Sequence, residues 1–323
     1  MQYTTLGRTG LKVSVAGLGA GGASRLGLAR GHSRKEAAAL VRSALDLGIN
    51  IIDTAQIYGT EDAIGDALKG VPRESVVLST KHLVKFEGRT YSAAEVVAGL
   101  NESLKRLGTD HVDVFFIHGL TVDRYDHAIN SVVSALKREQ EKGKFRFLGA
   151  TEAPPQEPRH QGTIKALADD LFDVVMVAFS LVNQNARELV FPRTLASRVG
   201  TMLMFVVRGI FADTAHLRAS FRVLSEKGEL PDWLAAKDDP LDFLVHAGGA
   251  TSHTDAAYRY ARHEPGADVV LFGTSSIAHM KENVASILAP PLPEADRAKV
   301  EELFGRLVGV GLETHSAPAQ SAR

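Results

Sequence analysis

Four residues that can hold or move a proton lie at the ends of apolar segments in this sequence. Asp53 ends one such segment, Tyr58 follows it closely, and Lys81 and His118 each come directly after one of the next two segments. Each residue alone has an ordinary explanation: an acid caps the following helix, a lysine is solvated, and a buried histidine is hydrogen-bonded. In a parallel barrel, however, the carboxyl ends of the strands converge on one face. We therefore expect the four side chains to share one site.

These four residue types suit the delivery of a proton to a carbonyl oxygen. A phenol has a pKa of about 10, and a nearby ammonium stabilises the phenolate and lowers that value. A carboxylate beside the ammonium keeps it charged and in place, and a histidine beside the phenol orients the carbonyl. We predict Tyr58 as the proton donor, Lys81 as the group that lowers its pKa, Asp53 as the partner of Lys81, and His118 as the orienting residue. None of these side chains supplies hydride, so a nicotinamide cofactor is implied.

The composition is that of an ordinary globular protein. The 323 residues are 45% hydrophobic and 23% charged, with a formal net charge of -1 and no cysteine. This charge balance gives no general attraction to nucleic acid or to a membrane surface, and a chain without cysteine has no disulfide or thiolate metal site. We expect neither a signal peptide nor a membrane-spanning segment. The sequence favours a cytoplasmic protein that acts on a small molecule.

Apolar strand-like segments alternate with helix-like segments along most of the chain. Ser33 with Glu36, and Ser92 with Glu95, have the spacing of capping boxes that begin helices, and Gly108 is placed to end the second helix. Strands that are apolar throughout are typical of parallel sheets covered on both faces. The pattern predicts either a closed parallel barrel or a doubly wound sheet, preceded by a hairpin. The hairpin is expected over residues 3–15, and the eight strands near 14–19, 49–53, 75–80, 112–117, 146–150, 173–177, 201–205 and 268–272.

Residues 206–253 form a long connection after the seventh expected strand. A connection of this length is usually functional or a small subdomain, and one that follows a barrel strand lies at the barrel mouth. We expect it to extend over the mouth of a single domain that spans residues 1–323. A last helix is expected near 294–309, and a flexible tail over 310–323.

The segment Gly17-Leu18-Gly19-Ala20-Gly21-Gly22 matches the glycine pattern of dinucleotide-binding folds. In those folds a helix begins directly after the motif, whereas here two further glycines interrupt the next residues and the first helix is expected near Ser33. A Rossmann dehydrogenase is therefore a minor alternative. We interpret the motif as a tight turn at the barrel mouth, whose backbone lets a ligand approach closely. The candidate contacts are Gly19, Ala20 and Gly21.

Five segments together resemble the aldo-keto reductase superfamily over nearly the whole chain. They are LGRTGLKVS in the hairpin, GINIIDTAQIYG, STK at 79–81, LNESLKRLGTDHVDVFFIH at 100–118 and FGTSSIAHMKENV at 272–284. The resemblance implies a (β/α)8 TIM barrel that the hairpin closes at its bottom. It also implies reversible NAD(P)H-dependent reduction of an aldehyde or ketone. The catalytic tetrad of the family falls on Asp53, Tyr58, Lys81 and His118.

The residues that would face the nicotinamide depart from the family pattern. Thr151 and Glu152 stand where the family usually has serine and asparagine, and Met176 replaces a glutamine. Met204 or Phe205 takes the place of the tyrosine that usually stacks on the nicotinamide ring. A carboxylate at Glu152 in place of an amide weakens the expected recognition of the carboxamide.

Residues 273–283 resemble the segment that binds the adenosine phosphate in this family. Small hydroxyl residues between a strand and a helix suit a phosphate, because backbone N–H groups and the helix dipole attract it. His279 stands where a basic residue often binds the 2′-phosphate of NADP, and a neutral histidine binds it less well than an arginine. NADP is therefore the preferred prediction, and NAD is the alternative. Further candidate cofactor contacts are Asp53, Arg208, Gly273, Thr274, Ser275, Glu282 and Asn283.

A second class of function is consistent with the same residues. The exchanges at Glu152 and Met176 suit a barrel that binds a nicotinamide cofactor as a sensor or regulatory subunit, with little turnover. Rapid multiple turnover with any carbonyl would exclude such a sensor. In either case the expected partner is a small molecule, and neither a metal ion, a nucleic acid nor a membrane is expected.

Overall fold

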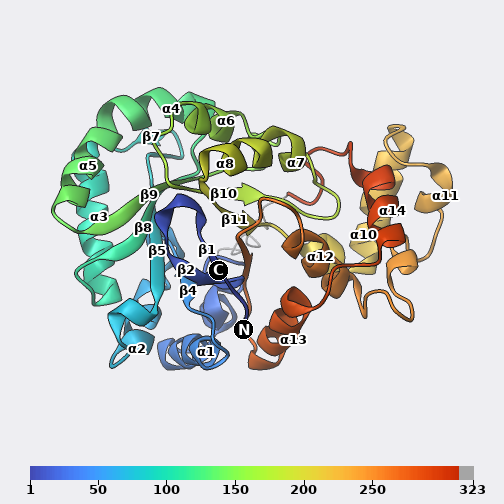
Figure 1. Cartoon of the computed structure of the whole chain (residues 1–323), viewed down its shortest axis with the longest axis horizontal. Coiled ribbons are helices and arrows are strands. Elements are labelled where there is room, and N and C mark those ends of the chain that lie inside the picture. Colours follow the sequence, from blue (N-terminus) through green and yellow to red (C-terminus); the bar gives the residue numbers. More distant parts are fainter. Residues whose placement is uncertain (313–323) are drawn as a thin grey trace, which may run out of the picture.

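Eight parallel strands close into a barrel in the computed structural model, which describes residues 1–312 (Figure 1). Around the ring the strands follow their order in the sequence, and the last strand pairs with the first. The closed ring confirms the predicted barrel and excludes the doubly wound sheet. The strands are β3 (Ala16–Gly19), β4 (Ile51–Asp53), β5 (Val77–Leu83), β8 (Val112–His118), β9 (Phe145–Thr151), β10 (Val174–Ala178), β11 (Gly200–Met204) and β12 (Val269–Phe272).

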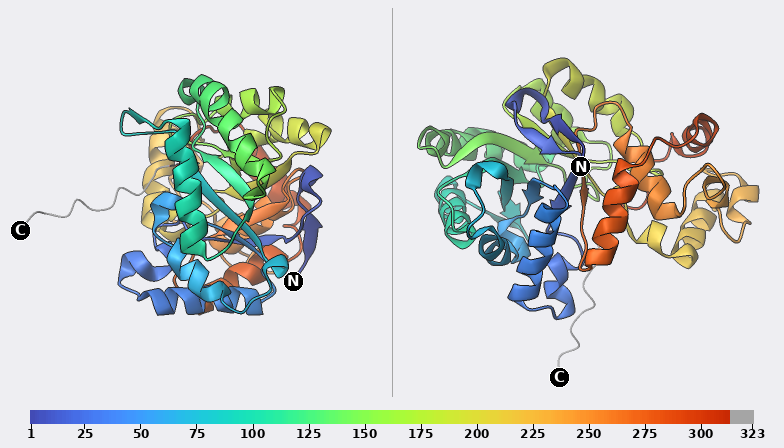
Figure 2. Two further views of the ribbon diagram at one scale, coloured as in Figure 1. Left: turned by 90° about the vertical axis from the view of Figure 1, so that its left-hand side faces the viewer. Right: turned by 60° about the horizontal axis from the view of Figure 1, so that its bottom comes forward.

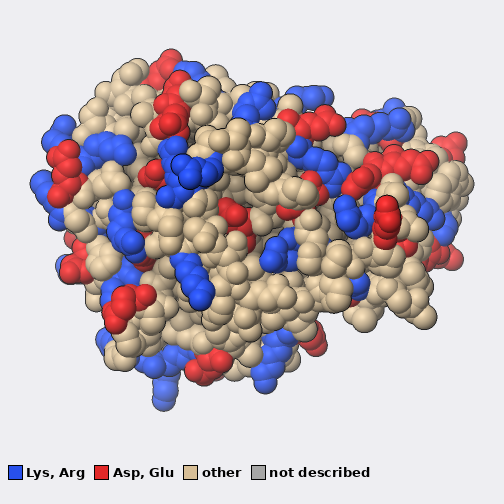
Figure 3. Space-filling model, viewed as in Figure 1, with Lys and Arg blue, Asp and Glu red and all other residues tan. Residues whose placement is uncertain are grey.

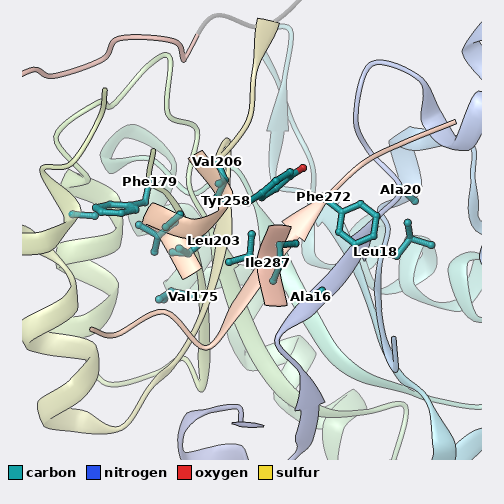
Figure 4. Packing of buried hydrophobic residues seen from close by; sticks show 14 of the residues in the cluster. Ala16, Leu18, Ala20, Val175, Phe179, Leu203, Val206, Tyr258, Phe272 and Ile287 are labelled. Carbon is teal, nitrogen blue, oxygen red and sulfur yellow. The ribbon is translucent and has the colours of Figure 1, made fainter. Parts of the chain in front are cut away.

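Side chains along each barrel strand alternate between the barrel interior and the layer beneath the helices. Ile51, Val77 and Val114 belong to the apolar cluster inside the barrel, whereas Ile52, Leu78 and their counterparts belong to the larger outer cluster. Figure 4 shows part of this outer layer. Because successive strand side chains point to opposite faces, every second residue faces the barrel interior up to the carboxyl end of each strand. At these ends the residues that face inward are Asp53, Lys81, His118 and Thr151.

The N-terminal hairpin closes the amino end of the barrel, as predicted. Its strands are β1 (Tyr3–Thr5) and β2 (Lys12–Ser14), and Leu6 and Leu11 join the cluster inside the barrel. Gly7 has a φ of +47°, and a Cβ at this position would stand 2.2 Å from the backbone nitrogen of Gly200. Only glycine therefore allows the hairpin to seat this closely against the barrel.

Helices surround the barrel (Figure 2), and two of them begin where the capping boxes predict. Capping boxes join Ser33 to Glu36 and Ser92 to Glu95, and Gly108 ends its helix in the left-handed conformation. The π-helical segment Ala128–Val133 joins two short helices after β8. The α-helices of this layer are α1 (Arg34–Asp46), α2 (Glu61–Leu68), α3 (Ala93–Leu107), α4 (Val122–His127), α5 (Ser134–Glu141), α6 (Gln161–Ala168), α7 (Ala186–Leu189), α8 (Phe191–Ser197), α12 (His253–Arg262) and α13 (Ile277–Leu288).

The long connection after β11 contains the helices α9 (Gly209–Ala212), α10 (Thr214–Glu226) and α11 (Asp232–Ala235). The helix α10 packs against α14 (Glu294–Phe304), with the rings of Phe221 and Phe304 5.5 Å apart, and both lie at one side of the molecule (Figure 1). The helix α14 is shorter than the predicted 294–309: it ends at Phe304, and Gly305 follows it. The position of residues 206–253 over the mouth stays a prediction. Of the predicted tail, residues 313–323 lie outside the described residues.

The glycine motif does not open a Rossmann helix. After β3 the chain forms an irregular 3₁₀ segment over Arg25–Arg30, in which Leu26 and Gly27 have non-helical backbone angles. The first α-helix begins only at Arg34. This geometry, together with the closed barrel, rules out the Rossmann alternative.

The surface carries both signs of charge. Figure 3 shows Lys and Arg interspersed with Asp and Glu over the face in view. Within residues 1–312, no helix combines the length and the apolar character needed to cross a membrane.

Candidate active site

Lys81 and Asp53 form a buried ion pair at the carboxyl ends of the neighbouring strands β5 and β4. Nζ of Lys81 donates to Oδ1 (2.7 Å) and Oδ2 (2.6 Å) of Asp53 and to the backbone oxygen of Thr54 (2.7 Å). Only 1% of Lys81 and 4% of Asp53 are exposed. Burial lowers the pKa of Lys81, and the carboxylate of Asp53 opposes that effect. All three N–H donors of the ammonium have acceptors, so the pair is fully hydrogen-bonded.

Tyr58 lies next to this pair, at the end of the 3₁₀ helix η3 (Gln56–Tyr58). Its hydroxyl is 3.3 Å from Nε2 of His118, and the two rings are perpendicular. Nζ of Lys81 stands 5.1 Å from the centroid of the phenol ring. Gly21 provides the space for this ring, because a Cβ there would stand 2.2 Å from Cε2 of Tyr58. The structure therefore brings Asp53, Tyr58, Lys81 and His118 together.

The protonation of this cluster differs from the expectation. Burial raises the pKa of Tyr58 above its usual range, and the charge of Asp53 adds to the increase. The net shift is thus opposite to the predicted lowering, because burial and the charge of Asp53 outweigh the positive charge nearby. Burial lowers the pKa of His118 to about 3, with further lowering from Lys81. At neutral pH the phenol is therefore protonated and the imidazole is neutral.

Thr151 and Glu152 lie where β9 leaves the barrel, but their polar atoms are used internally. Oγ1 of Thr151 accepts a hydrogen bond from the backbone N–H of Gly119, at 2.9 Å. The carboxylate of Glu152 contacts Nδ1 of His160 at 2.6 Å and accepts from the backbone N–H of Ala178 at 3.0 Å. Burial lowers the pKa of His160, but Glu152 outweighs this effect, so the pKa is raised. Glu152 thus connects the loop that contains His160 to the carboxyl end of β10.

The predicted contacts on β10 and β11 lie at different depths. The side chain of Met176 belongs to the cluster inside the barrel, and Met204 packs against that cluster at the end of β11. Phe205 leaves the strand with a φ of 64°, and the guanidinium of Arg208 lies over its ring at 4.2 Å from the centroid. The structure shows where the two side chains lie, and which of them contacts the nicotinamide stays a prediction. Met204 faces the barrel interior, and Phe205 is covered by Arg208.

The segment after β12 has the features of a phosphate site. Ser276 caps α13 by accepting from the backbone N–H of His279, and the first amides of a helix lack intrahelical partners. Gly273 lies against Gly22 of the glycine turn, and Nη1 of Arg30 is 3.5 Å from Oγ of Ser275. Open amides beside an arginine fit the phosphates of a nicotinamide dinucleotide. His279 and Glu282 are exposed on α13, and Asn283 is half-buried.

Three arginines near these groups were not among the predicted site residues. Arg25 and Arg30 belong to the irregular segment that follows the glycine motif. Arg124 lies on α4 and donates to the backbone oxygen of Gly119 at 2.7 Å. The one sequence signal for Arg25 and Arg30 is their position in residues 23–32, which directly follow the glycine motif.

A large surface cavity lies away from this site. A cavity of about 910 Å³ is lined by α2, α3 and the residues that precede β5 and β8. It lies toward the amino ends of these strands and contains none of the four clustered residues. The site is therefore identified by its chemistry rather than by cavity size.

The chain matches the model of the aldo/keto reductase family over residues 17–304 and belongs to this family. It is 29% identical over 302 residues to L-galactose dehydrogenase of Arabidopsis thaliana, covering 89% of this chain and 88% of that protein. It is 26% identical to the aldo-keto reductase YhdN of Bacillus subtilis, covering 99% of each. The solved holo form of the aldo-keto reductase AKR11C1 from Bacillus halodurans has a TM-score of 0.70 at 24% identity, covering 99% of both chains, which supports the fold.

Family membership defines the chemistry in general terms. The protein is an oxidoreductase with a (β/α)8 barrel, and its family reduces carbonyl groups with a nicotinamide cofactor. This class agrees with the cluster of proton-handling residues at the carboxyl ends of the strands.

Proposed function

We propose that the protein catalyses the reversible NAD(P)H-dependent reduction of an aldehyde or ketone, with Tyr58, Lys81, Asp53 and His118 as its catalytic tetrad. The observation that carries this proposal is the 3.3 Å approach of the Tyr58 hydroxyl to Nε2 of His118 beside the buried Lys81–Asp53 pair. A carbonyl oxygen that contacts both the phenol and the imidazole is oriented and polarised by them. The nicotinamide, when bound, supplies the hydride.

Each member of the tetrad has a distinct role. Tyr58 donates its phenolic proton to the carbonyl oxygen in reduction, and as phenolate it accepts the proton in oxidation. His118 is neutral and donates a hydrogen bond through Nε2 to the same oxygen, since Nδ1 is buried without a partner among the described residues. Lys81 provides a fixed positive charge 5.1 Å from the phenol ring centroid, and Asp53 holds Lys81 in place.

NADP is the cofactor that the charged residues favour. Arg30 beside Ser275 supplies a guanidinium at the phosphate segment, and Arg208 supplies a second on the segment that follows β11. Guanidinium groups bind phosphate with two parallel hydrogen bonds, which compensates for the weaker His279. The glycine turn and Gly273 let the cofactor backbone approach closely. Glu152, whose carboxylate is already bonded to His160, contributes to the shape of the nicotinamide site rather than to a direct contact.

A cofactor titration followed by a turnover screen tests the proposal. We expect NADPH to bind at least about tenfold more tightly than NADH, because a phosphate–arginine contact contributes more than 1.4 kcal/mol. Stopped-flow absorbance then follows oxidation of NADPH with a panel of aldehydes and ketones. L-Galactose with NADP⁺ is included because of the similarity to L-galactose dehydrogenase. Rapid multiple turnover supports the enzyme, whereas tight binding without turnover on any substrate supports the sensor.

The pH dependence of the two directions should differ. Tyr58, with its raised pKa, and His118, with a pKa of about 3, keep their protonation states across neutral pH. We expect kcat/KM for reduction to change less than about twofold between roughly pH 6 and 9, because the phenol stays protonated below its ordinary pKa of about 10. Oxidation requires the phenolate, so its kcat/KM should rise over the same interval. Steady-state rates at constant ionic strength measure both directions. A reduction rate that already decreases as the pH rises toward about 8 would contradict the assignment of Tyr58 as the proton donor.

A further inference from the structure

Two arginines flank the Tyr58–His118 pair from different loops. Arg124 lies on α4, and its Nη1 donates to the backbone oxygen of Gly119, which directly follows His118. Arg25 lies on the loop after β3, four residues after Gly21, which contacts the phenol ring. The charge of Arg124 lowers the pKa of His118, and that of Arg25 counteracts the increase in the pKa of Tyr58. Both cations are therefore electrostatically close to the groups that would hold the carbonyl.

The acidic groups around the site are already neutralised by other partners. Asp53 is bonded to Lys81, and Glu152 is bonded to His160 and a backbone amide. Asp123 lies 4.0 Å from Nε of Arg124 and makes its closer ion pair, at 2.9 Å, with Lys85. These pairings leave positive charge in excess beside the tetrad.

Neither arginine is used to neutralise an internal carboxylate at hydrogen-bond distance. Within residues 1–312, Arg25 has no ion pair and no side-chain hydrogen bond, and it is exposed. Nε of Arg124 is buried and has no hydrogen-bond partner among the described residues. Its guanidinium is largely shielded, with 19% of the side chain exposed, so its charge is screened less by solvent than that of a surface residue.

We propose that the substrate carries an anionic group next to its carbonyl-bearing portion, and that Arg25 and Arg124 attract and bind this group. This inference rests on the proposed function, since it assigns the substrate class of the same site. Guanidinium groups suit both carboxylate and phosphate. The excess positive charge at the mouth also raises the local concentration of anionic substrates.

Paired aldehydes test the inference with the purified chain and saturating NADPH. The first pair is 4-carboxybenzaldehyde and 4-methylbenzaldehyde, and the second is glyceraldehyde 3-phosphate and glyceraldehyde. We expect kcat/KM for at least one anionic member to exceed that of its neutral partner by about tenfold or more at low salt. Sodium chloride at high concentration should reduce this ratio, because it screens the arginines. The pair with the larger anionic-to-neutral ratio of kcat/KM shows whether the site prefers a carboxylate or a phosphate.

Single substitutions assign the effect to residues. Arg25→Gln and Arg124→Gln should each lower the anionic-to-neutral ratio by about threefold or more, whereas Arg138→Gln, on the exposed face of α5, should leave the ratio unchanged. If Arg124→Gln fails to fold by circular dichroism, Arg25→Gln decides the question. An unchanged ratio in these variants would overturn the assignment.

The two levels of the proposal fail in different ways. Neutral aldehydes that are reduced as efficiently as their anionic partners overturn the substrate class and leave the reductase intact. If NADPH is oxidised neither with the four aldehydes nor with the wider carbonyl panel, the reductase activity on which the inference rests is overturned.

Discussion

Replacing Tyr58 by phenylalanine should lower kcat by at least about 10³-fold, since a positioned general acid contributes roughly 10² to 10⁴. Affinity for the cofactor should stay within about twofold, because phenylalanine retains the ring that packs against Gly21 and faces Lys81. Only the hydroxyl that stands 3.3 Å from Nε2 of His118 is lost. Fluorescence titration with NADPH and single-turnover rates measure the two quantities separately.

The matched control for this variant is Tyr125→Phe. The hydroxyl of Tyr125 donates to Oδ2 of Asp169 at 2.6 Å on the outer helices, away from the tetrad. Its loss should cost about 1 kcal/mol of stability and leave turnover intact. Turnover that persists in Tyr58→Phe would disprove the proposed proton donor.

The second large effect concerns stability rather than rate. Asp53→Asn should lower the free energy of unfolding by about 3–5 kcal/mol, because it leaves the buried ammonium of Lys81 without its counter-charge. The double variant Asp53→Asn/Lys81→Met removes that charge and should recover most of the loss. Both variants should be inactive. Urea unfolding followed by circular dichroism measures the free energies.

An exposed ion pair provides the comparison. Asp66 lies 2.5 Å from Arg34 and 2.7 Å from Lys69 at the surface, and Asp66→Asn should change stability far less than Asp53→Asn, because exposed pairs contribute little. If Asp53→Asn unfolds at the same urea concentration as the unchanged protein, Lys81 does not depend on Asp53 for its burial.

The barrel and the convergence of the clustered residues could be predicted from the sequence, because both follow from local patterns. Apolar runs bounded by capping boxes locate strands and helices, and the two-residue repeat of a strand places Asp53, Lys81 and His118 on one face. The end of the last helix could not be predicted, because Gly305, which follows Phe304, does not adopt the left-handed conformation that usually marks a helix-ending glycine.

The state of the site could not be predicted from residue types. The pKa of Tyr58 depends on the balance between burial, Asp53 and more distant charges, and this balance reversed the expected direction. Glu152 was expected to face the cofactor, but its partner His160 lies on a loop whose left-handed backbone brings the imidazole beside it. Arg25 lies in an irregular segment and Arg124 in a helix of only six residues, and neither gives a sequence pattern that indicates which way the side chain points.

A lysine beside a tyrosine can both supply a positive charge and transfer a proton, but the hydrogen bonds of Lys81 allow only the first. Each N–H of its ammonium is already bonded to Asp53 or to the backbone of Thr54, so none is free to hand a proton to the phenol. In the proposed mechanism, Lys81 therefore supplies a fixed positive charge and does not transfer a proton to Tyr58. In the same proposed mechanism, Tyr58 is reprotonated after each reduction by water at its half-buried side. If Tyr58 is the proton donor, exchange with bulk solvent at the barrel mouth, rather than relay through the interior, completes the catalytic cycle.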